Sequence, residues 1–296
     1  MRPERPPTDR PVLPLAARLE SSFRRAALYG VLVVFAVPLA FPMWWMISTS
    51  LKSAAQIFAY PPSLLPDGLH VENYVQVFTL APFARQFFNS LYIGVANTVG
   101  TILVASIAGY AFARISFPGR TILFLLLLTA LLMPGEVTII PLFVLMRELD
   151  WLGTHLPLLI EPMFGAQAVV GTFLMRQYFL SLPVELEDAG RIDGLSRFGI
   201  FRHIALPLAK PAIATLAILT FLGSWNAFLE PLIFLSGEPD LFTIPIALQQ
   251  YVERDGFPIW QVQLAATTIS VIPMIVIFVL AQRYFIQGVA SVGVKG

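Results

Sequence analysis

The sequence predicts an all-α integral membrane protein with six transmembrane helices and a folded, charged segment between the fourth and fifth of them. The chain has 296 residues, of which 57% are hydrophobic and only 12% are charged, and its mean hydropathy is +0.75. A soluble domain carries about twice that share of charged residues. Six long apolar runs, each near or above the roughly 20 residues that span a bilayer, give the number of helices.

The same composition excludes several classes of function. The chain has no cysteine, which rules out disulfides, thiolate metal sites and a cysteine nucleophile. Three histidines, His70, His155 and His203, are too few to favour a histidine-rich metal site, and we interpret His203 as a solvated or groove-contacting residue. The net charge of +1 provides no basic field for nucleic acid. We therefore expect neither a metal site nor nucleic-acid binding.

The N-terminal residues 1–25 are polar and rich in proline and arginine, a composition that cannot bury a core, so we expect a flexible tail. The apolar run 26–47 follows. A cleaved signal peptide is the alternative, but its apolar region would be about 7–15 residues long. This run is longer and ends in two tryptophans, which suit an interface anchor, so we predict that it stays as the first span. Pro38 and Pro42 are expected to kink it.

Five further apolar runs complete a six-helix domain over residues 26–286, and a short tail, 287–296, ends the chain. The five spans are 86–113, 121–146, 156–179, 211–234 and 263–285. The second span has no charged residue and carries small residues that let helices approach closely in lipid, namely Gly94, Gly100, Ala105, Ser106 and Gly109. The third is interrupted at Pro134-Gly135-Glu136 and by Pro141.

The distribution of Lys and Arg predicts the orientation. With six spans both termini lie on one side, and that side collects 15 of the 19 basic residues. The other four are Lys52, Arg85, Arg147 and Arg254. Because basic residues concentrate on the cytoplasmic side, we predict that the termini and residues 181–211 are cytoplasmic. The two long loops, 48–85 and 235–262, then lie outside.

The charged segment 181–211 is patterned like folded structure. Ser181 with Pro183 is typical of a helix start. Apolar residues then recur every three positions at Leu186, Ala189 and Ile192, which predicts one apolar side on a short helix. Asp193-Gly194 is expected to end that helix, because glycine tolerates the left-handed conformation.

A second short helix is expected to begin at Ser196 as its cap, with Phe198, Phe201 and Ile204 as its apolar residues. Leu206-Pro207 closes the unit. The two helices together present a narrow apolar ridge flanked by charge, which suits insertion into a groove on a partner protein. The alternative is an amphipathic loop lying on the membrane surface.

Three acids fall at membrane depth, and a buried acid in a span is a candidate functional residue. They are Glu136, Glu161 and Glu230. Each also has a structural interpretation: Glu136 would lie at a helix break, Glu161 at the membrane interface and Glu230 at the outer mouth of its span. Trp225-Asn226, in the middle of the fifth span, combine a stacking ring with a hydrogen-bonding amide, which suits a sugar or polyol. Helix packing by the ring and an interhelical hydrogen bond by the amide explain them equally.

Catalytic and nucleotide-binding signatures are missing from the sequence. It contains no G-x-x-x-x-G-K-[ST] loop for ATP and no H-E-x-x-H, G-x-S-x-G or EF-hand pattern. An intramembrane enzyme would need a convergent nucleophile–base pair or metal set, which we do not find. A secondary transporter driven by H⁺ or Na⁺ remains the alternative, with the three membrane acids as its ion-coupling groups.

The run Asp188-Ala189-Gly190-Arg191-Ile192-Asp193-Gly194, followed by Ile204, Leu206-Pro207 and Pro211, resembles the E-A-A-x-x-D-G … I-x-L-P loop of permease subunits in bacterial ATP-binding cassette importers. The resemblance extends from about residue 38 to the C-terminus. Within that family the chain resembles the carbohydrate branch, specifically the second permease subunit of maltose and glycerol-3-phosphate type systems. The supporting stretches are FPMWWMISTSLKS, AGYAFARISFPGR, MPGEVTIIPLF, MRQYFLSLP, FLGSWNAFLEPL and QRYFIQGVASVGVKG.

Two positions depart from the family pattern. Its glutamate is Asp188 here, with Glu187 beside it, so either acid could be the functional one. Its second alanine is Gly190, which weakens a helix by up to about 1 kcal/mol.

The resemblance implies that segment 181–211 is a coupling helix seated in a groove of a separate ATPase subunit. The implied coupling residues are Glu187, Asp188, Ala189, Gly190, Asp193, Gly194, Leu195, Phe198, Phe201, Ile204, Leu206 and Pro207. ATP and Mg would be bound by that ATPase, expected in two copies, and this chain would hold no cofactor and catalyse no reaction. A homologous second permease and an extracytoplasmic solute-binding protein would complete the complex in the lipid of the bacterial inner membrane.

Overall fold

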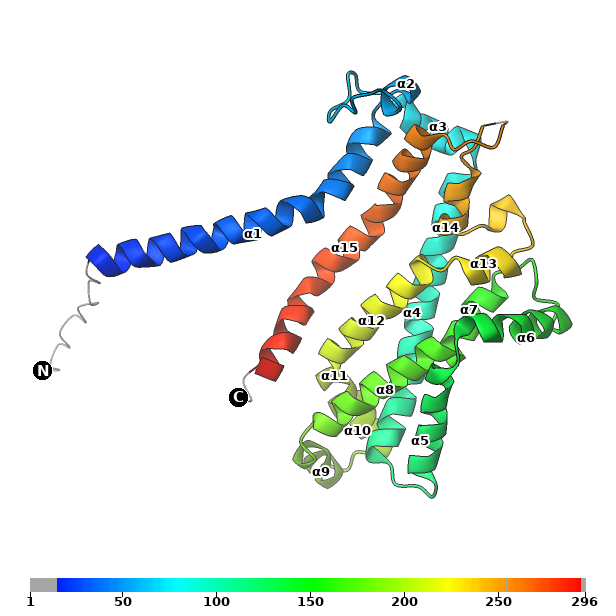
Figure 1. The fold of residues 1–296 in the computed structure, drawn as a ribbon. Helices are drawn as coiled ribbons and strands as arrows, with labels where there is room; N and C mark the ends of the chain where they lie inside the picture. Colours follow the sequence, from blue (N-terminus) through cyan, green and yellow to red (C-terminus); the bar gives the residue numbers. More distant parts are fainter. Residues whose placement is uncertain (1–14, 254, 294–296) are drawn as a thin grey trace, which may run out of the picture.

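A computed structural model describes residues 15–253 and 255–293 of the chain. Helices and their connections make up this part, apart from one isolated antiparallel bridge between Val252 and Pro258. The all-α prediction is therefore confirmed. The long helices α4, α8, α12 and α15 run side by side, while α1 approaches α15 near α2 and diverges from the bundle toward its N-terminal end (Figure 1). The short helices α2 and α3 lie at one end of the bundle and α9 at the other.

Four helical segments within the described residues are long and apolar enough to cross a membrane, and up to six if each of two bent pairs counts as one span. The four are Ala27–Ser50, Phe83–Arg114, Leu156–Ser181 and Trp260–Leu280. They belong to α1 (Leu15–Ser50), α4 (Phe83–Arg114), α7 (Leu156–Phe164) with α8 (Ala166–Ser181), and α15 (Trp260–Gly293).

The third, fourth and fifth predicted spans are not single helices, and the fourth divides into the α7 and α8 given above. Residues 121–146 divide into α5 (Arg120–Thr129) and α6 (Gly135–Glu148), and the two parts are bent by 99° at the predicted proline–glycine break. Residues 211–234 divide into α12 (Lys210–Trp225) and α13 (Leu229–Phe234). The reason at the first break is that a proline stops the incoming helix and a new helix starts directly after it.

The structure also differs from the prediction at the two ends of the chain. α1 begins at Leu15, so the second half of the expected 1–25 tail is helical, while residues 1–14 lie outside the described part. α15 continues to Gly293, so most of the expected 287–296 tail extends the last helix, and residues 294–296 lie outside the described part. In both places a helix continues beyond its apolar run, because hydropathy sets the membrane-crossing part of a helix and not its length.

Helix α4 is the centre of the bundle and packs against α7, α8 and α12. The α4–α8 crossing is close because small residues line it. A Cβ on Gly109 would lie 2.7 Å from Met175 Cβ and 2.9 Å from the backbone nitrogen of Arg176. A Cβ on Gly171 would lie 2.9 Å from that of Ala105. These contacts confirm that small residues of the second span allow close helix approach.

Replacing Gly109 with valine is therefore expected to push α4 and α8 apart. Backbone atoms of α8 cannot move aside as a flexible side chain can, so the cost should be about 1–3 kcal/mol of stability. Thermal unfolding of the detergent-solubilised protein measures the loss. Gly30→Val is the control, because no atom of the described part of the chain lies within 4 Å of a Cβ at Gly30. Equal melting temperatures for both variants would contradict the close crossing.

The two long connections at the α2–α3 end are folded rather than extended loops. The first contains α2 (Ala54–Ile57) and α3 (Glu72–Leu80). Its fully buried Lys52 ammonium donates to the carbonyl of Ser63 at 2.6 Å and lies 4.3 Å from the ring centre of Trp45. Burial lowers the pKa of Lys52, and the nearby Asp67 carboxylate partly offsets that effect.

The second connection contains the short helix α14 (Ile244–Ala247) and is held on α4 by three polar side chains. Gln86 donates to the carbonyl of Pro239 at 3.0 Å, and Asn89 donates to the carbonyl of Asp240 at 2.8 Å. The hydroxyl of Ser90 accepts from the amide of Ile244 at 2.8 Å. The central helix of the bundle therefore fixes the position of this connection.

Candidate coupling segment and membrane cavity

The charged segment between α8 and α12 forms a compact helical unit at the end of the bundle opposite α2 and α3 (Figure 1). It consists of α9 (Glu185–Ile192), α10 (Arg197–Ile200), one π-helical turn (Phe201–Ala205) and α11 (Leu206–Leu208). The residues from Arg197 to Leu208 form one helical piece, bent by 75° relative to α12. The predicted pair of short helices is thus present.

Two predicted details of this unit are wrong. Ser181 is the last residue of α8 and does not cap α9, whose N-cap is Val184 without a capping side chain. Leu206-Pro207 does not close the unit, because the helix continues through Leu208. Proline is accepted there in the first turn of α11, where its missing N–H costs little.

The turn between the two helices matches its prediction. Gly194 has φ of +81°, and the amide of Leu195 donates to the carbonyl of Gly190 at 2.9 Å. Together with the bond from the Gly194 amide to the carbonyl of Arg191 at 3.0 Å, this is a Schellman ending of α9. The Ser196 hydroxyl then accepts from the amide of Gly199 at 3.1 Å and caps α10.

The apolar ridge is only partly as predicted. Leu186, Ile192 and Phe198 are exposed, with 87% of Ile192 and 66% of Phe198 accessible to solvent. Phe201, in contrast, is buried and packs at 5.1 Å between ring centres against Tyr110 of α4. Phe201 therefore anchors the unit to the bundle instead of extending the ridge. The sequence could not show this, because a helical period does not tell which apolar residues face the rest of the bundle.

A shallow groove runs between α9 and the helical piece that follows it. Its lining residues are Leu186, Ala189, Gly190, Asp193, His203, Ile204, Pro207 and Leu208. Gly190 permits the close contact at its base, because a Cβ there would lie 2.6 Å from Cδ1 of Ile204. The departure of Gly190 from the family alanine therefore has a packing reason.

The two adjacent acids of α9 point in opposite directions. Glu187 is 4% exposed, and one carboxylate oxygen lies 3.1 Å from Nε of Arg114, the last residue of α4. The two charged groups attract each other, but this nitrogen and this oxygen are not aligned for a hydrogen bond. The Tyr110 hydroxyl donates to the other carboxylate oxygen of Glu187 at 3.4 Å. Asp188 is exposed and pairs with Arg191 at 2.9 Å. Glu187 thus ties α9 to the bundle, and Asp188 is presented to the outside.

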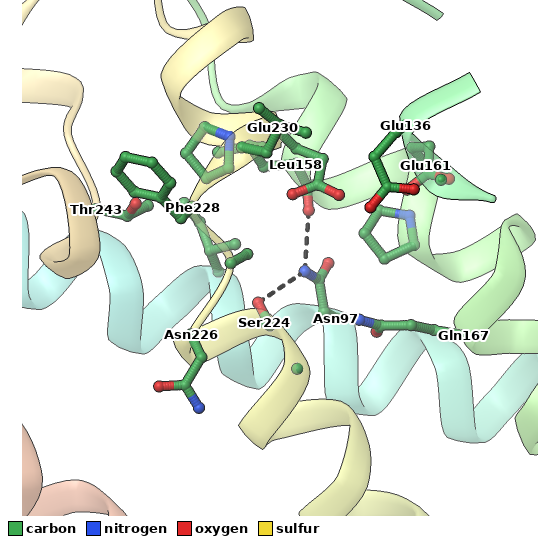
Figure 2. A pocket seen from close by; sticks show the side chains of 17 residues that line it. Asn97, Glu136, Leu158, Glu161, Gln167, Ser224, Asn226, Phe228, Glu230 and Thr243 are labelled. Carbon is green, nitrogen blue, oxygen red and sulfur yellow. Dashed lines mark hydrogen bonds between the residues drawn. The ribbon is translucent and has the colours of Figure 1, made fainter. Parts of the chain in front are cut away.

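A second candidate site is a cavity of about 390 Å³ inside the bundle, where three helix breaks meet (Figure 2). The breaks lie between α5 and α6, between α7 and α8, and between α12 and α13. Glu136, Glu161 and Glu230, one from each broken segment, all line this cavity. The structure therefore brings together three acids that are far apart in the sequence.

The predicted stacking pair does not act as a pair. Trp225 is 3% exposed, stacks on Phe221 at 5.5 Å between ring centres, and is not among the lining residues. Asn226 does line the cavity, but it ends α12 rather than lying in mid-helix, and its amide donates to the carbonyl of Leu222 at 2.9 Å. Trp225 therefore packs between helices and does not contact the cavity, as the structural interpretation of this residue predicts.

Four polar residues that the sequence analysis did not single out also line the cavity: Asn97, Gln167, Ser224 and Thr243. Asn97 of α4 donates to the carbonyl of Leu158 at 2.9 Å and to the hydroxyl of Ser224 at 3.0 Å (Figure 2). The available signal was a polar residue in the middle of an uncharged apolar run. Within the described residues, no group of three or more His, Asp and Glu side chains is arranged to hold a metal.

The chain is similar to membrane components of known transport systems. Residues 101–291 match the family described as "Binding-protein-dependent transport system inner membrane component". The arabinooligosaccharides transport system permease protein AraQ of Halalkalibacterium halodurans is 38% identical over 259 residues, covering 86% of this chain and 91% of that protein. The sn-glycerol-3-phosphate transport system permease protein UgpE of Brucella abortus is 32% identical, covering 88% and 94%.

Among solved structures, the chain is similar to a subunit of a bacterial ABC transporter involved in the import of the acidic polysaccharide alginate. The TM-score is 0.75 at 25% identity, covering 93% of this chain and all of that one. The helical bundle, its membrane-crossing segments and the family match over most of the chain agree. This protein belongs to the binding-protein-dependent transport system inner membrane components, and is a multi-pass permease of the ABC importer type.

Proposed function

We propose that this chain is one of two different permease subunits of an ATP-driven importer for a sugar or sugar-like solute. The observation that carries the proposal is the α9–α11 unit, which presents Leu186, Ile192, Phe198 and Asp188 to the outside of the bundle. Exposed apolar residues beside a groove form a surface for another folded protein. Because this chain lacks a P-loop, the energy source is a separate ATPase, present in two copies, that binds ATP and Mg.

The packing gives a route from that surface to the cavity. Glu187 links α9 to the end of α4, and Phe201 packs against Tyr110 of α4 and Phe179 of α8. Helix α4 also carries Asn97, which lines the cavity. A displacement of the α9–α11 unit by ATPase closure would therefore move α4 as a rigid element and change the shape of the cavity.

The opposite end of the bundle suits a solute-binding protein. We propose that the two connections at 48–85 and 235–262 receive it outside the cytoplasm, while both termini and α9–α11 are cytoplasmic. The connection at 235–262 is fastened to α4 through Gln86, Asn89 and Ser90. Docking outside and ATPase closure inside would then act on the same helix.

An ion-coupled transporter is the second candidate, because three carboxylates line one cavity. Purification of the tagged protein from its native membranes in mild detergent, with mass spectrometry of the copurifying proteins, separates the two. The importer predicts a P-loop ATPase, a second permease and a solute-binding protein, and uptake into proteoliposomes that needs ATP and tolerates a protonophore. Recovery of this chain alone, with uptake abolished by the protonophore, would establish the ion-coupled transporter instead.

A further inference from the structure

The polar atoms left without a partner in the membrane cavity share one chemical property. Oδ1 of Asn97 and Oε1 of Gln167 are buried and have no hydrogen-bond partner among the described residues, and neither does Oγ1 of Thr243. Both Asn97 and Thr243 are at most 3% exposed. Amide oxygens accept hydrogen bonds and cannot donate them, and a hydroxyl can do both. A buried acceptor without a donor is costly, so these atoms favour a ligand that brings donors.

The carboxylates of Glu136, Glu161 and Glu230 line the same cavity and are also acceptors when ionised. None of the three takes part in an ion pair with a described residue. Among the described residues that line the cavity there is no lysine, arginine or histidine. In Figure 2 the side chains of Glu136, Asn97 and Gln167 project toward the same space. The cavity is therefore rich in carboxyl and amide oxygens, and no cationic side chain lines it to pair with them.

We propose that this cavity binds a hydroxyl-rich saccharide or polyol without negative charge, and that it rejects anionic solutes such as sugar phosphates, sulfonates and uronates. The hydroxyl groups of such a solute would donate hydrogen bonds to the unpartnered amide oxygens of Asn97 and Gln167 and to the carboxyl oxygens. The phosphate, sulfonate or carboxylate group of an anionic solute supplies only acceptors, and it meets the carboxyl oxygens of the cavity in a low-dielectric site. This inference rests on the proposed function and narrows it, since it assigns the solute class of the same permease.

Capping of helix starts explains only part of this arrangement. Glu136 and Glu230 lie in the first turns of α6 and α13, where a carboxylate is favourable whatever the cavity does. Glu161 lies toward the end of α7, and its carboxylate reaches Gly165, the N-cap of α8, so a helix start is next to it as well. The buried unpartnered oxygens of Asn97 and Thr243 are different: Thr243 is the N-cap residue of α14, but its hydroxyl makes no capping hydrogen bond, and Asn97 lies inside α4. A ligand site accounts for all five residues.

The test is direct binding to the purified permease complex by saturation-transfer NMR. The probes are a panel of neutral mono-, di- and trisaccharides and polyols, each beside its uronate or phosphate counterpart. We expect saturation transfer to at least one neutral probe and binding weaker by about tenfold or more for its anionic counterpart. The combined variant Glu136→Gln, Glu161→Gln, Glu230→Gln should reduce this preference to less than about threefold.

Two single variants keep the test independent of how well the combined variant folds. Thr243→Val removes one unpartnered hydroxyl while preserving shape, and should weaken binding of the neutral probe roughly three- to tenfold. Glu148→Gln is the matched control on α6, because Glu148 is exposed, pairs with Arg147 and does not line the cavity. It should leave both affinities unchanged.

Equal or stronger binding of the anionic probes by the unsubstituted complex would overturn the inference, and so would no binding of any probe. An unchanged neutral affinity in Thr243→Val together with an unchanged preference in the combined variant would overturn it as well. The ATP-driven import of the proposed function is tested separately, and it fails if no ATPase copurifies and uptake does not need ATP.

Discussion

Glu187→Ala is expected to cost about 3–5 kcal/mol of stability, the largest effect of any single substitution considered for this protein. The variant leaves the guanidinium of Arg114 buried, with 10% of its side chain exposed, and without the carboxylate that lies 3.1 Å away. A buried charge without its partner loses the attraction that offset its desolvation. The junction between α4 and α9 should therefore loosen, and transport should fall with it.

Thermal unfolding and ATP-dependent uptake of the variant measure both effects. The neighbouring Asp188→Asn is the matched control, because the Asp188–Arg191 pair has both side chains more than half exposed and contributes about 0–1 kcal/mol at most. It should leave the melting temperature unchanged. If Asp188 contacts the ATPase, Asp188→Asn should weaken copurification of the ATPase without lowering stability, which separates the roles of the two acids.

A double variant tests whether charge or shape matters at the junction. Replacing both partners, as in Glu187→Leu with Arg114→Met, removes the buried charge as well as its counterion and should recover most of the lost stability. If Glu187→Ala is as stable as the unsubstituted protein, the buried ion pair does not hold α9 to the bundle. If the double variant is stable but does not transport, the pair has a directional role beyond stability.

Gly194→Val is expected to reduce transport by about tenfold or more while the transmembrane bundle stays folded. The residue ends α9 with φ of +81°, and a non-glycine residue in that conformation costs roughly 1–2 kcal/mol, more for a β-branched side chain. No described residue lies within 4 Å of a Cβ there, so the effect is on the backbone turn and not on packing. A changed turn would shift α9 relative to α10 and spoil the surface that the ATPase contacts.

Gly119→Val provides a control with the same backbone cost. Gly119 has φ of +79°, also has nothing within 4 Å of a Cβ, and precedes α5. Both variants should lower stability by a similar small amount, but only Gly194→Val should release the ATPase during purification and uncouple ATP hydrolysis from uptake. Equal transport by the two variants would mean that α9 and α10 are not the coupling surface.

Local chemistry made much of this protein predictable from its sequence. Apolar runs of bilayer length predicted the membrane class, because the bilayer core requires about 20 apolar residues whatever packs beside them. Gly194 and Ser196 were predicted correctly for the same reason: a positive φ and a capping hydroxyl act on the nearest few residues. The break at Pro134 was predicted from short-range geometry too, although its 99° bend was not, and the break in the fifth span was not predicted.

Long-range packing decided which way each side chain faces, toward the bundle or toward solvent. Phe201 and Trp225 were candidates for contact with a partner or a solute, yet both are core residues, because a periodic pattern defines a helix face but not what covers it. The adjacent acids Glu187 and Asp188 are equivalent candidates in the sequence, but in the structure Glu187 pairs with Arg114 of α4 and Asp188 is exposed.

The cavity could be known only from the tertiary structure. Glu136, Glu161 and Glu230 are spread over almost a hundred residues, and each alone had an ordinary structural explanation. Three helix breaks place them in one cavity with Asn97, a polar residue of α4. Helix formation and membrane insertion depend on neighbours in sequence, whereas a binding site depends on which side chains from distant segments share one space, and that is set by packing alone.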